Sequence, residues 1–380
     1  MSKPLAIGLI IFFVGIIALG IVFIAFRGNP TLITSPPDTG GSSFPQSGTK
    51  PQIPAAPGTL PSERDLIKIT NGAVSGFTLT PTGVRFVEKA TGHVFDASPD
   101  GQTQTKISNT TIPKTINVLW SSHINYAIMR YRENEEIKTA SAEFTDAKTN
   151  GVLLPANILS FTHSPDRSRI FYTIPGSGDT VGIAANIDNT SQSQIMRLPN
   201  ADFIAHWYGP REISFLTPPS AFAEGFLYRY NIDIGSFEKL LGGIPGLDIL
   251  WSKNKTKILF SQANIGTGKS NLFILNIKTG ATQDLETEGF AQKCAWKDDL
   301  LVYCAIPTTI QKGAYPDDWL KGVLSFDDRI WWIDTDTLEK TIVKTLPNID
   351  ISEIRISAEG DYLYFQNKKD GALWSLQLVD

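Results

Sequence analysis

The stretch that decides the fold runs from Leu247 to Leu285 and reads LDILWSKNKTKILFSQANIGTGKSNLFILNIKTGATQDL. It contains four short runs rich in Ile, Leu and Phe, and turns rich in Gly, Asn and Lys separate them. Such runs are typical of β-strands joined by tight turns. A sheet of four short strands cannot bury both of its faces alone, so we expect similar sheets on either side of it.

The rest of the chain supplies these sheets. The same unit recurs from Leu66 onward, and its predicted first strands begin near Val74, Val118, Ile158, Phe203, Leu247, Lys293 and Ile351. The last copy shows three strands, whereas Leu66–Thr70 is a single apolar strand before the first copy. We therefore expect Leu66–Thr70 to complete the last sheet, which would remove two exposed edges.

Tryptophans mark the repeats. Trp120, Trp207, Trp251 and Trp296 close the first strand in four copies. A repeat of about 40–50 residues with four strands is typical of a β-propeller. The sequence therefore predicts an all-β fold, a seven-bladed β-propeller. Six or eight blades remain open as alternatives, because the first two copies follow the pattern less closely.

Two copies also resemble a known family. Trp251-Ser252 followed by Ile258–Phe260, and Ser164–Asp166 followed by Ile170–Tyr172, are similar to the WD40-like repeats of TolB-type propellers. The resemblance extends from Leu66 to Asp380. It implies a propeller fold and a tendency to bind partners, and it implies no reaction.

The sixth copy adds a second resemblance. Its segments Pro316–Trp319 and Arg329–Asp334 are similar to segments of uncharacterised membrane-anchored bacterial propeller proteins. Such proteins have no assigned activity, so this resemblance implies a location at a membrane and no chemistry.

The N-terminal region predicts such an anchor. Leu5–Phe26 contains no charged residue, and its 22 residues would rise by about 33 Å as a helix, enough to cross a bilayer. A cleavable signal peptide would have a shorter apolar region. We expect an uncleaved transmembrane helix with its N-terminus in the cytoplasm and the following domain on the extracytoplasmic side of the cell membrane, although Lys3 and Arg27 nearly balance across the helix.

A linker follows the predicted helix. Gly28–Pro61 carries eight prolines with many Gly, Ser and Thr residues and shows no apolar period. This composition predicts an extended tether rather than a packed element. The expected domains are therefore a transmembrane anchor at residues 1–27, a linker at residues 28–62 and the propeller at residues 63–380.

Composition excludes several classes of function. The net charge is −4 and the basic residues are scattered, so we expect no nucleic-acid partner. Two cysteines and four widely separated histidines do not form a metal-binding pattern, and we expect no metal and no cofactor. We name no catalytic residue. His163–Asp166 combines a base, a hydroxyl and a carboxylate, but neighbours in a turn seldom form a catalytic triad.

Long loops on one face indicate where the propeller binds. We expect them at Pro175–Thr180, Thr217–Gly225, Gln262–Ser270 and Pro307–Ser325, on the face that also carries the connections between blades. The last loop supplies the candidate partner-binding residues, which are Tyr315, Asp317, Asp318, Trp319 and, just beyond it, Phe326. Aromatic rings would provide contact area and the acids would pair with a basic group. Alternatively, Trp319 folds back to cover the blade and the acids cap a turn.

Two functional classes follow. We expect a non-enzymatic module, anchored in the membrane, that binds or scaffolds a protein or peptide. The alternative is an extracytoplasmic enzyme, such as a hydrolase, with acidic residues converging at the propeller pore.

The two cysteines flank one predicted turn. Cys294 and Cys304 would face one another across an antiparallel pair if the turn between them has three residues, and export would permit a disulfide. A shift of one residue in the turn would separate them. Both alternatives, a disulfide and two buried, unpaired cysteines, are compatible with the sequence.

Overall fold

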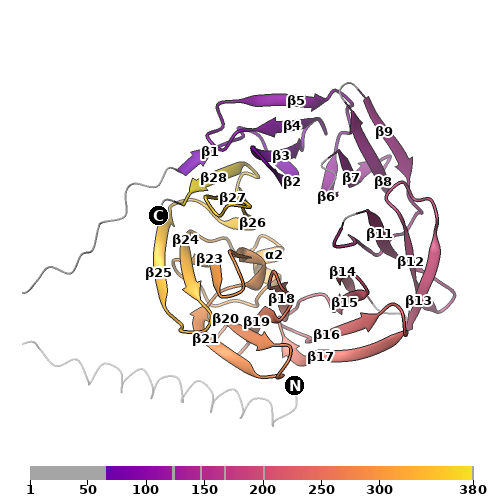
Figure 1. Cartoon of the computed structure of the whole chain (residues 1–380). Helices are drawn as coiled ribbons and strands as arrows, with labels where there is room; N and C mark the ends of the chain where they lie inside the picture. Colours follow the sequence, from indigo (N-terminus) through magenta and orange to yellow (C-terminus); the bar gives the residue numbers. More distant parts are fainter. Residues whose placement is uncertain (1–65, 122–124, 146–147, 167, 200–201, 379–380) are drawn as a thin grey trace, which may run out of the picture. The chain divides into compact units, whose positions relative to one another are not determined.

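The computed structural model confirms a seven-bladed, all-β propeller (Figure 1). It describes residues 66–121, 125–145, 148–166, 168–199 and 202–378. The predicted transmembrane helix at Leu5–Phe26 and the linker at residues 28–62 lie outside these residues. No helix within the described part of the chain is long and apolar enough to cross a bilayer.

Each blade is a sheet of four antiparallel strands, and in blades 1–6 the order of the strands follows the sequence. Blade 1 contains β2 (Val74–Thr80), β3 (Gly83–Glu88), β4 (Val94–Ala97) and β5 (Gln104–Ser108). Blade 2 contains β6 (Thr115–Trp120), β7 (Tyr126–Glu133), β8 (Glu136–Thr145) and β9 (Lys148–Leu153). Blade 3 contains β10 (Ser160–His163), β11 (Arg169–Pro175), β12 (Asp179–Asn186) and β13 (Ser193–Pro199).

The following blades repeat this arrangement. Blade 4 contains β14 (Ile204–Gly209), β15 (Glu212–Leu216), β16 (Glu224–Asn231) and β17 (Ser236–Pro245). Blade 5 contains β18 (Asp248–Trp251), β19 (Lys257–Asn264), β20 (Lys269–Asn276) and β21 (Thr282–Glu288). Blade 6 follows the short helix η1 (Ala291–Lys293) and contains β22 (Cys294–Trp296), β23 (Leu301–Pro307), β24 (Asp328–Asp334) and β25 (Lys340–Leu346). Its helix α2 (Asp317–Leu320) lies between β23 and β24.

The last blade closes the ring, as predicted. Blade 7 contains β26 (Ile351–Ile356), β27 (Tyr362–Asn367) and β28 (Leu373–Gln377), and its fourth strand is β1 (Leu66–Lys68) from the other end of the described chain. β1 runs antiparallel to β28, with Leu66 opposite Leu376 and Lys68 opposite Trp374. The pairing removes two unpaired edges at the junction of the first and last blades.

The apolar core lies between the blades. Within the described residues, seven clusters of buried side chains each join two successive sheets around the ring. The repeated tryptophans contribute to these interfaces, and the ring of Trp251 stacks on that of Tyr208 from the preceding blade at 3.9 Å between centroids. Each blade therefore buries its second face against its neighbour, which explains why one four-stranded unit requires copies of itself.

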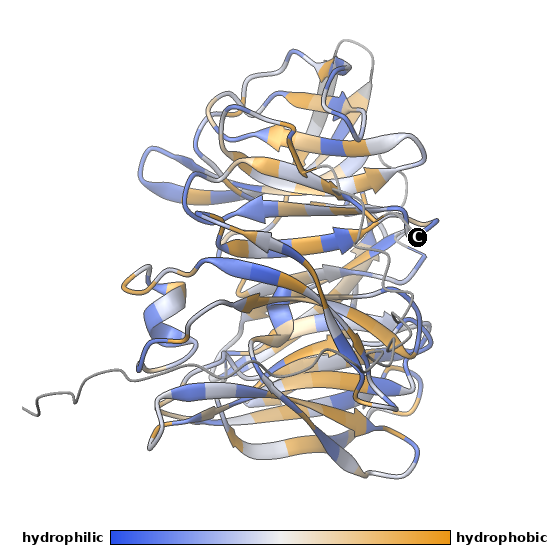
Figure 2. Cartoon of the chain, turned by 90° about the vertical axis from the view of Figure 1, so that its left-hand side faces the viewer, coloured by the Kyte–Doolittle hydropathy of each residue, from blue (hydrophilic) through white to orange (hydrophobic). Residues whose placement is uncertain are grey.

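The propeller has two unlike faces. Since successive strands alternate in direction, the second-to-third strand loops and the connections between blades share one face, named here the loop face. The remaining turns lie on the opposite, turn face. Leu66 lies toward the turn face, because β1 is antiparallel to β28 and β28 begins at the loop face. In a side view, α2 projects from one face and the C-terminal end lies at the other (Figure 2).

Some expected boundaries were wrong. The predicted long loop at Pro175–Thr180 is a short turn, since Pro175 still pairs with Thr180. The predicted loop at Gln262–Ser270 is also shorter, because β19 extends to Asn264 and pairs there with Lys269. The ends of these strands consist of polar residues, so no run of apolar residues marks them in the sequence. For the same reason the sequence did not predict β9, which is the outer strand of blade 2.

Candidate functional site

The candidate site is built on the capping loop, defined here as residues 308–327 between β23 and β24. It is the expected long loop of the sixth copy, and it carries α2. Figure 1 places α2 inside the ring of blades, and Figure 2 shows it standing out from one face. The loop therefore covers part of the loop face of the propeller.

Hydrogen bonds tie the capping loop to three neighbouring blades. In blade 4, the amide of Ala221 and the hydroxyl of Ser220 donate to the carboxylate of Asp317 at 2.7 Å and 3.1 Å. In blade 5, Gly268 accepts a hydrogen bond from the Gly313 amide at 3.3 Å. In blade 7, the amine of Lys368 donates to the Trp319 carbonyl at 2.6 Å. These contacts fix the loop from both sides of blade 6.

One glycine allows the loop to approach closely. Gly246 joins blade 4 to blade 5 and has a φ of +65°, a left-handed conformation that favours glycine. A Cβ at this position would lie 2.6 Å from the Cβ of Ala263 and 2.9 Å from the carbonyl oxygen of Tyr315. A larger residue would therefore push the capping loop away from the connection beneath it.

Three aromatic rings of the capping loop pack on a fourth ring beneath it. Phe290 precedes η1, and its ring packs against those of Tyr315, Trp319 and Phe326, with centroid distances of 5.3, 5.8 and 5.8 Å. All four side chains are buried. This cluster is separate from the clusters between blades, so the capping loop has a small core of its own.

A fully buried group of charges lies beneath these rings. The amine of Lys293 lies 2.8 Å from a carboxylate oxygen of Asp328 and 2.8 Å from one of Asp350, and all three side chains are inaccessible to solvent. Asp328 also accepts a hydrogen bond from the Ile351 amide at 2.7 Å. Asp350 accepts further bonds from Trp319 Nε1 at 3.0 Å, Ser325 Oγ at 3.0 Å and the Phe326 amide at 3.1 Å.

The two carboxyl groups of this cluster differ in acidity. Burial raises the pKa of Asp328, and the opposing charge of Lys293 does not cancel this effect. Burial also acts to raise the pKa of Asp350, but the charge and hydrogen bond of Lys293, with the bonds from Trp319 and Phe326, outweigh it and lower this pKa. Buried charges are costly unless they are paired and hydrogen-bonded, and here each carboxylate has several partners.

The structure places the predicted partner-binding residues together, but it turns their aromatic rings inward. Tyr315 and Trp319 are each 1% exposed and Phe326 is 3% exposed. The acids serve the loop itself: Asp317 binds blade 4, and Asp318 accepts a hydrogen bond from the Ala314 amide at 2.8 Å. The alternative interpretation, in which Trp319 folds back and the acids cap a turn, describes this arrangement. In this conformation the three rings are not available for contact with a partner.

Other side chains on this face are exposed instead. Leu320 and Val323 of the capping loop are 49% and 68% exposed, and Phe222 on the neighbouring loop of blade 4 is 72% exposed. Phe222 follows Ala221, whose amide binds Asp317, and Leu320 lies one helical turn after Asp317. These three residues are called the apolar patch below. Lys321 next to Leu320 has 66% of its side chain exposed.

Two titratable groups on the innermost strands have shifted pKa values. Asp248 begins β18, and burial raises its pKa to about 6, against the lowering effect of hydrogen bonds from the Ile249 and Gln292 amides. His206 lies in β14 of the neighbouring blade, and desolvation, together with the charge of Lys255, lowers its pKa to about 4. The side chain of His206 is nevertheless exposed, although neighbouring groups surround it closely enough to disfavour its charged form. Shifted pKa values of this kind occur in active sites as well as in structural networks.

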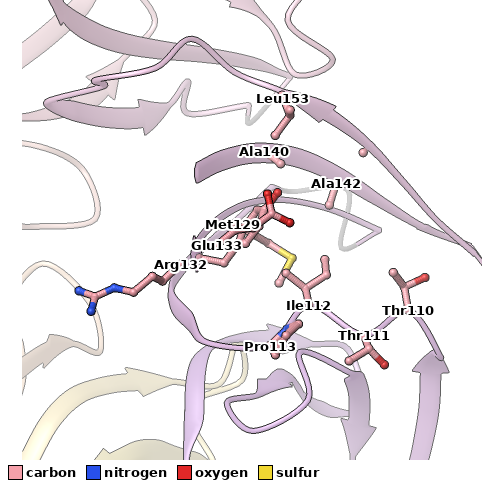
Figure 3. Close-up of a pocket in the computed structure, with 12 residues that line it drawn as sticks. Thr110, Thr111, Ile112, Pro113, Met129, Arg132, Glu133, Ala140, Ala142 and Leu153 are labelled. Atoms are coloured by element: carbon pink, nitrogen blue, oxygen red, sulfur yellow. The ribbon is translucent and has the colours of Figure 1, made fainter. Parts of the chain in front are cut away.

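A separate groove lies between blades 1 and 2 (Figure 3). It has a volume of about 490 Å³, and Ile112, Met129, Ala140 and Ala142 form much of its lining. Arg132 extends away from these apolar residues in Figure 3. The polar side chains of its lining are those of Thr110, Thr111, Tyr131, Arg132 and Glu133. The described residues contain no set of three or more His, Cys, Asp or Glu side chains placed to hold a metal ion.

The predicted cysteine pair forms a disulfide in the structure. Cys294 in β22 lies directly opposite Cys304 in β23, with 4.0 Å between the Cα atoms, and the two sulfurs are bonded. The bond lies in the apolar cluster between blades 5 and 6. It fixes the first hairpin of the blade that carries the capping loop.

Comparison with solved structures places the fold among known propellers. TolB from Acinetobacter baumannii is 14% identical, with a TM-score of 0.47 over 77% of this chain and 64% of that chain. An oligogalacturonate lyase from Vibrio parahaemolyticus is 9% identical, with a TM-score of 0.56 over 84% and 95%. The β-propeller domain of Cps50 from Myceliophteria thermophila is 10% identical, with a TM-score of 0.54 over 83% and 100%.

The likenesses to the lyase and to the Cps50 domain confirm the β-propeller at the level of the fold. The chain spans less than two thirds of the TolB chain, and identities this low carry no activity or partner from one protein to another. No family model matches the sequence, and no curated protein matches it either. Function must therefore be argued from the residues of this chain.

The sequence predicts the position of the capping loop but not the charged residues that lie beneath it. Asp350 lies between Ile349 and Ile351, and a charged residue between apolar ones is a sign of a buried ion pair. Asp328 lies between Asp327 and Arg329, and Lys293 follows Gln292, so no such signal marks these two positions. Nor does a local pattern predict the assembly of the three residues, because each comes from a different strand or connection.

Proposed function

We propose that the protein is a membrane-anchored, extracytoplasmic propeller whose loop face binds a protein or peptide. The apolar patch of Phe222, Leu320 and Val323 is the observation that supports this proposal most directly. Exposed apolar residues that gather around one well-anchored loop are typical of interaction sites. The capping loop is held by hydrogen bonds to three neighbouring blades and by its own core, so a partner would meet a surface that is already ordered, which lowers the entropic cost of binding.

Membrane anchorage is the second part of the proposal. It is supported by the uncharged segment Leu5–Phe26 and by a disulfide that suits an oxidising compartment. We expect the mature protein to remain in the membrane fraction after a carbonate wash and to keep its N-terminal residues. A mature chain that begins after Phe26 would instead identify a signal peptide.

The binding face is tested by recovery of partners from membranes of the source organism with the full chain as bait. Changing Phe222, Leu320 and Val323 together to serine should abolish recovery of the partner while the melting temperature stays within a few degrees. The matched control changes Ile234 and Leu300 to serine, since these residues are 76% and 47% exposed on turns of the opposite face. Equal loss of recovery in both variants, or in neither, would place the binding site elsewhere.

Changing Asp317, Asp318 and Trp319 to alanine would not test binding alone. Trp319 is buried and Asp317 holds the loop on blade 4, so that variant would displace the capping loop as well as any partner.

An enzymatic role is the second candidate function, and the shifted pKa values of Asp248 and His206 support it. Both lie on innermost strands, and their pKa values are shifted in opposite directions by burial. A hydrolytic activity that is lost in both Asp248→Asn and His206→Ala, but kept in the serine variant of the apolar patch, would support this role.

A further inference from the structure

The charge cluster beneath the capping loop contains an amine and two carboxyl groups, which are the groups that a condensation to an amide requires. Lys293 Nζ lies 2.9 Å and 2.8 Å from the two oxygens of Asp328, so it is also close to the carbon atom between them. A second carboxylate, that of Asp350, lies 2.8 Å from the same nitrogen. Nucleophile, electrophile and base are therefore in contact before any movement of the chain.

We propose that Lys293 and Asp328 join in an intramolecular isopeptide bond, with Asp350 as the base that transfers the proton. The site is a modification site that goes beyond the proposed binding function and does not depend on it. The bond would link η1 to the first residue of β24, and these residues are 35 positions apart in the chain.

The reaction balances without any added reactant. The Lys293 ammonium gives one proton to Oδ1 of the Asp328 carboxylate, and the neutral amine then attacks Cγ of the protonated carboxyl group. As the new bond forms, the nitrogen gives a second proton to Asp350 Oδ1. The Ile351 amide, 2.7 Å from Asp328 Oδ2, stabilises the negative charge that develops on that oxygen. The Cγ–Oδ1 bond then breaks, and Oδ1 leaves as water with the proton that Asp350 returns. One ammonium and one carboxylate have become one amide and one water molecule.

The surroundings favour this chemistry over a simple ion pair. The three side chains are fully buried, and the rings of Trp319 and Phe326 lie 5.2 Å and 5.0 Å from Lys293 Nζ. Ions are costly in such a place, so a neutral amide relieves two buried charges. Burial also raises the pKa of Asp328, which favours the protonated acid that the attack requires, while the bonds to Asp350 hold its pKa low.

The test is the mass of the purified full chain. After reduction of the disulfide, the intact protein should be lighter than its sequence by one water molecule. Trypsin should fail to cut after Lys293, because its amine is acylated, and the peptide that contains Lys293 should be covalently linked to the peptide that contains Asp328. Asp350→Asn keeps the size of the side chain and removes the base, and this variant should show the full mass and normal cleavage.

A surface pair provides the control within the same sample. Lys257 Nζ lies 2.6 Å from Asp336, whose side chain is 57% exposed, and we expect no linkage there. If Asp350→Asn does not fold, the peptide map of the unchanged protein decides alone. Full recovery of a peptide that ends at Lys293, without any linked peptide, would overturn the proposal. Linkage at both Lys293 and Lys257 would overturn the role assigned to burial and to Asp350.

Discussion

At the scale of single residues, the charged groups of this propeller that depart most from ordinary behaviour are enclosed ones. Asp248 accepts a hydrogen bond from the Ile249 amide at 2.9 Å, yet its pKa is raised to about 6 because burial disfavours the ionised form. An unfolded chain would give this carboxyl a pKa of about 3.9. Asp248 is therefore protonated in both states in strong acid, whereas at neutral pH folding must bury its charge.

This difference predicts a pH-dependent gain from Asp248→Asn. A raised pKa in the folded state contributes stability that is present below the unfolded value and is lost as the pH rises through about 6. The neutral asparagine avoids this loss, so it should stabilise the protein by about 1–3 kcal/mol at pH 7 and by little near pH 4. Denaturant unfolding at the two pH values measures the effect.

The control for this change is Asp202→Asn, since Asp202 is exposed. That variant should alter the free energy of unfolding by less than about 0.5 kcal/mol at either pH. A gain for Asp248→Asn that is the same at pH 4 and pH 7 would show that the burial of a charge at this position is not the cause.

At the scale of elements, strands rich in apolar residues were predicted well from the sequence, and strands rich in polar residues were predicted poorly. The apolar runs within Leu247–Leu285 were recognised because strands inside a blade must bury side chains on both faces. β9, which includes Lys148, Thr149 and Asn150, was missed because an outer strand packs on one side only and needs no apolar run. Backbone pairing also extended β19 by polar residues that had been assigned to a loop.

The capping loop shows where sequence reasoning stopped. Its position and length were predicted, but the direction of its aromatic side chains was not. Trp319 turns inward because its ring stacks on Phe290 and lies near the amine of Lys293, and its Nε1 donates a hydrogen bond to Asp350. These three partners come from two other connections of the chain. A local pattern cannot reveal partners that the fold brings from elsewhere, so Tyr315 and Trp319 resembled an exposed binding motif.

The sequence alone was compatible with a disulfide and with two unpaired cysteines, and the strand register determines that the disulfide forms. Cys294 and Cys304 lie opposite one another because β22 and β23 pair without a shift. Closing a loop of this length stabilises a fold by about 3 kcal/mol in the chain-entropy model. The bond therefore supports the hairpin at the base of the capping loop.

At the scale of the whole molecule, the ring depends on β1. This strand pairs with β28, and Ile69 just after it is 3% exposed within the cluster that joins blades 7 and 1. Beyond the strand, the hydroxyl of Thr70 accepts a hydrogen bond from the Leu373 amide at 2.9 Å. The first and last blades are thus held together by both backbone pairing and apolar contact.

Removing this strand should open the ring. We expect deletion of Pro61–Thr70 to lower the melting temperature by at least about 5 °C, since it exposes the edge of β28 and removes Ile69 from the core. Deletion of Thr49–Gly58, a stretch of equal length in the expected linker, is the control and should leave the melting temperature unchanged. Equal melting curves for both deletions would mean that β1 does not close the propeller.

The pairing of β1 with β28 also sets the order of events during synthesis. The ribosome makes β1 before every blade, but its partner β28 is made after all other strands of the propeller. Blades can form one after another while the chain grows, yet no nascent chain can close the ring until β28 has left the ribosome exit tunnel. Until then both edges stay exposed to other strands. A premature stop codon that removes β28 would therefore leave an almost complete set of blades as an open, aggregation-prone product.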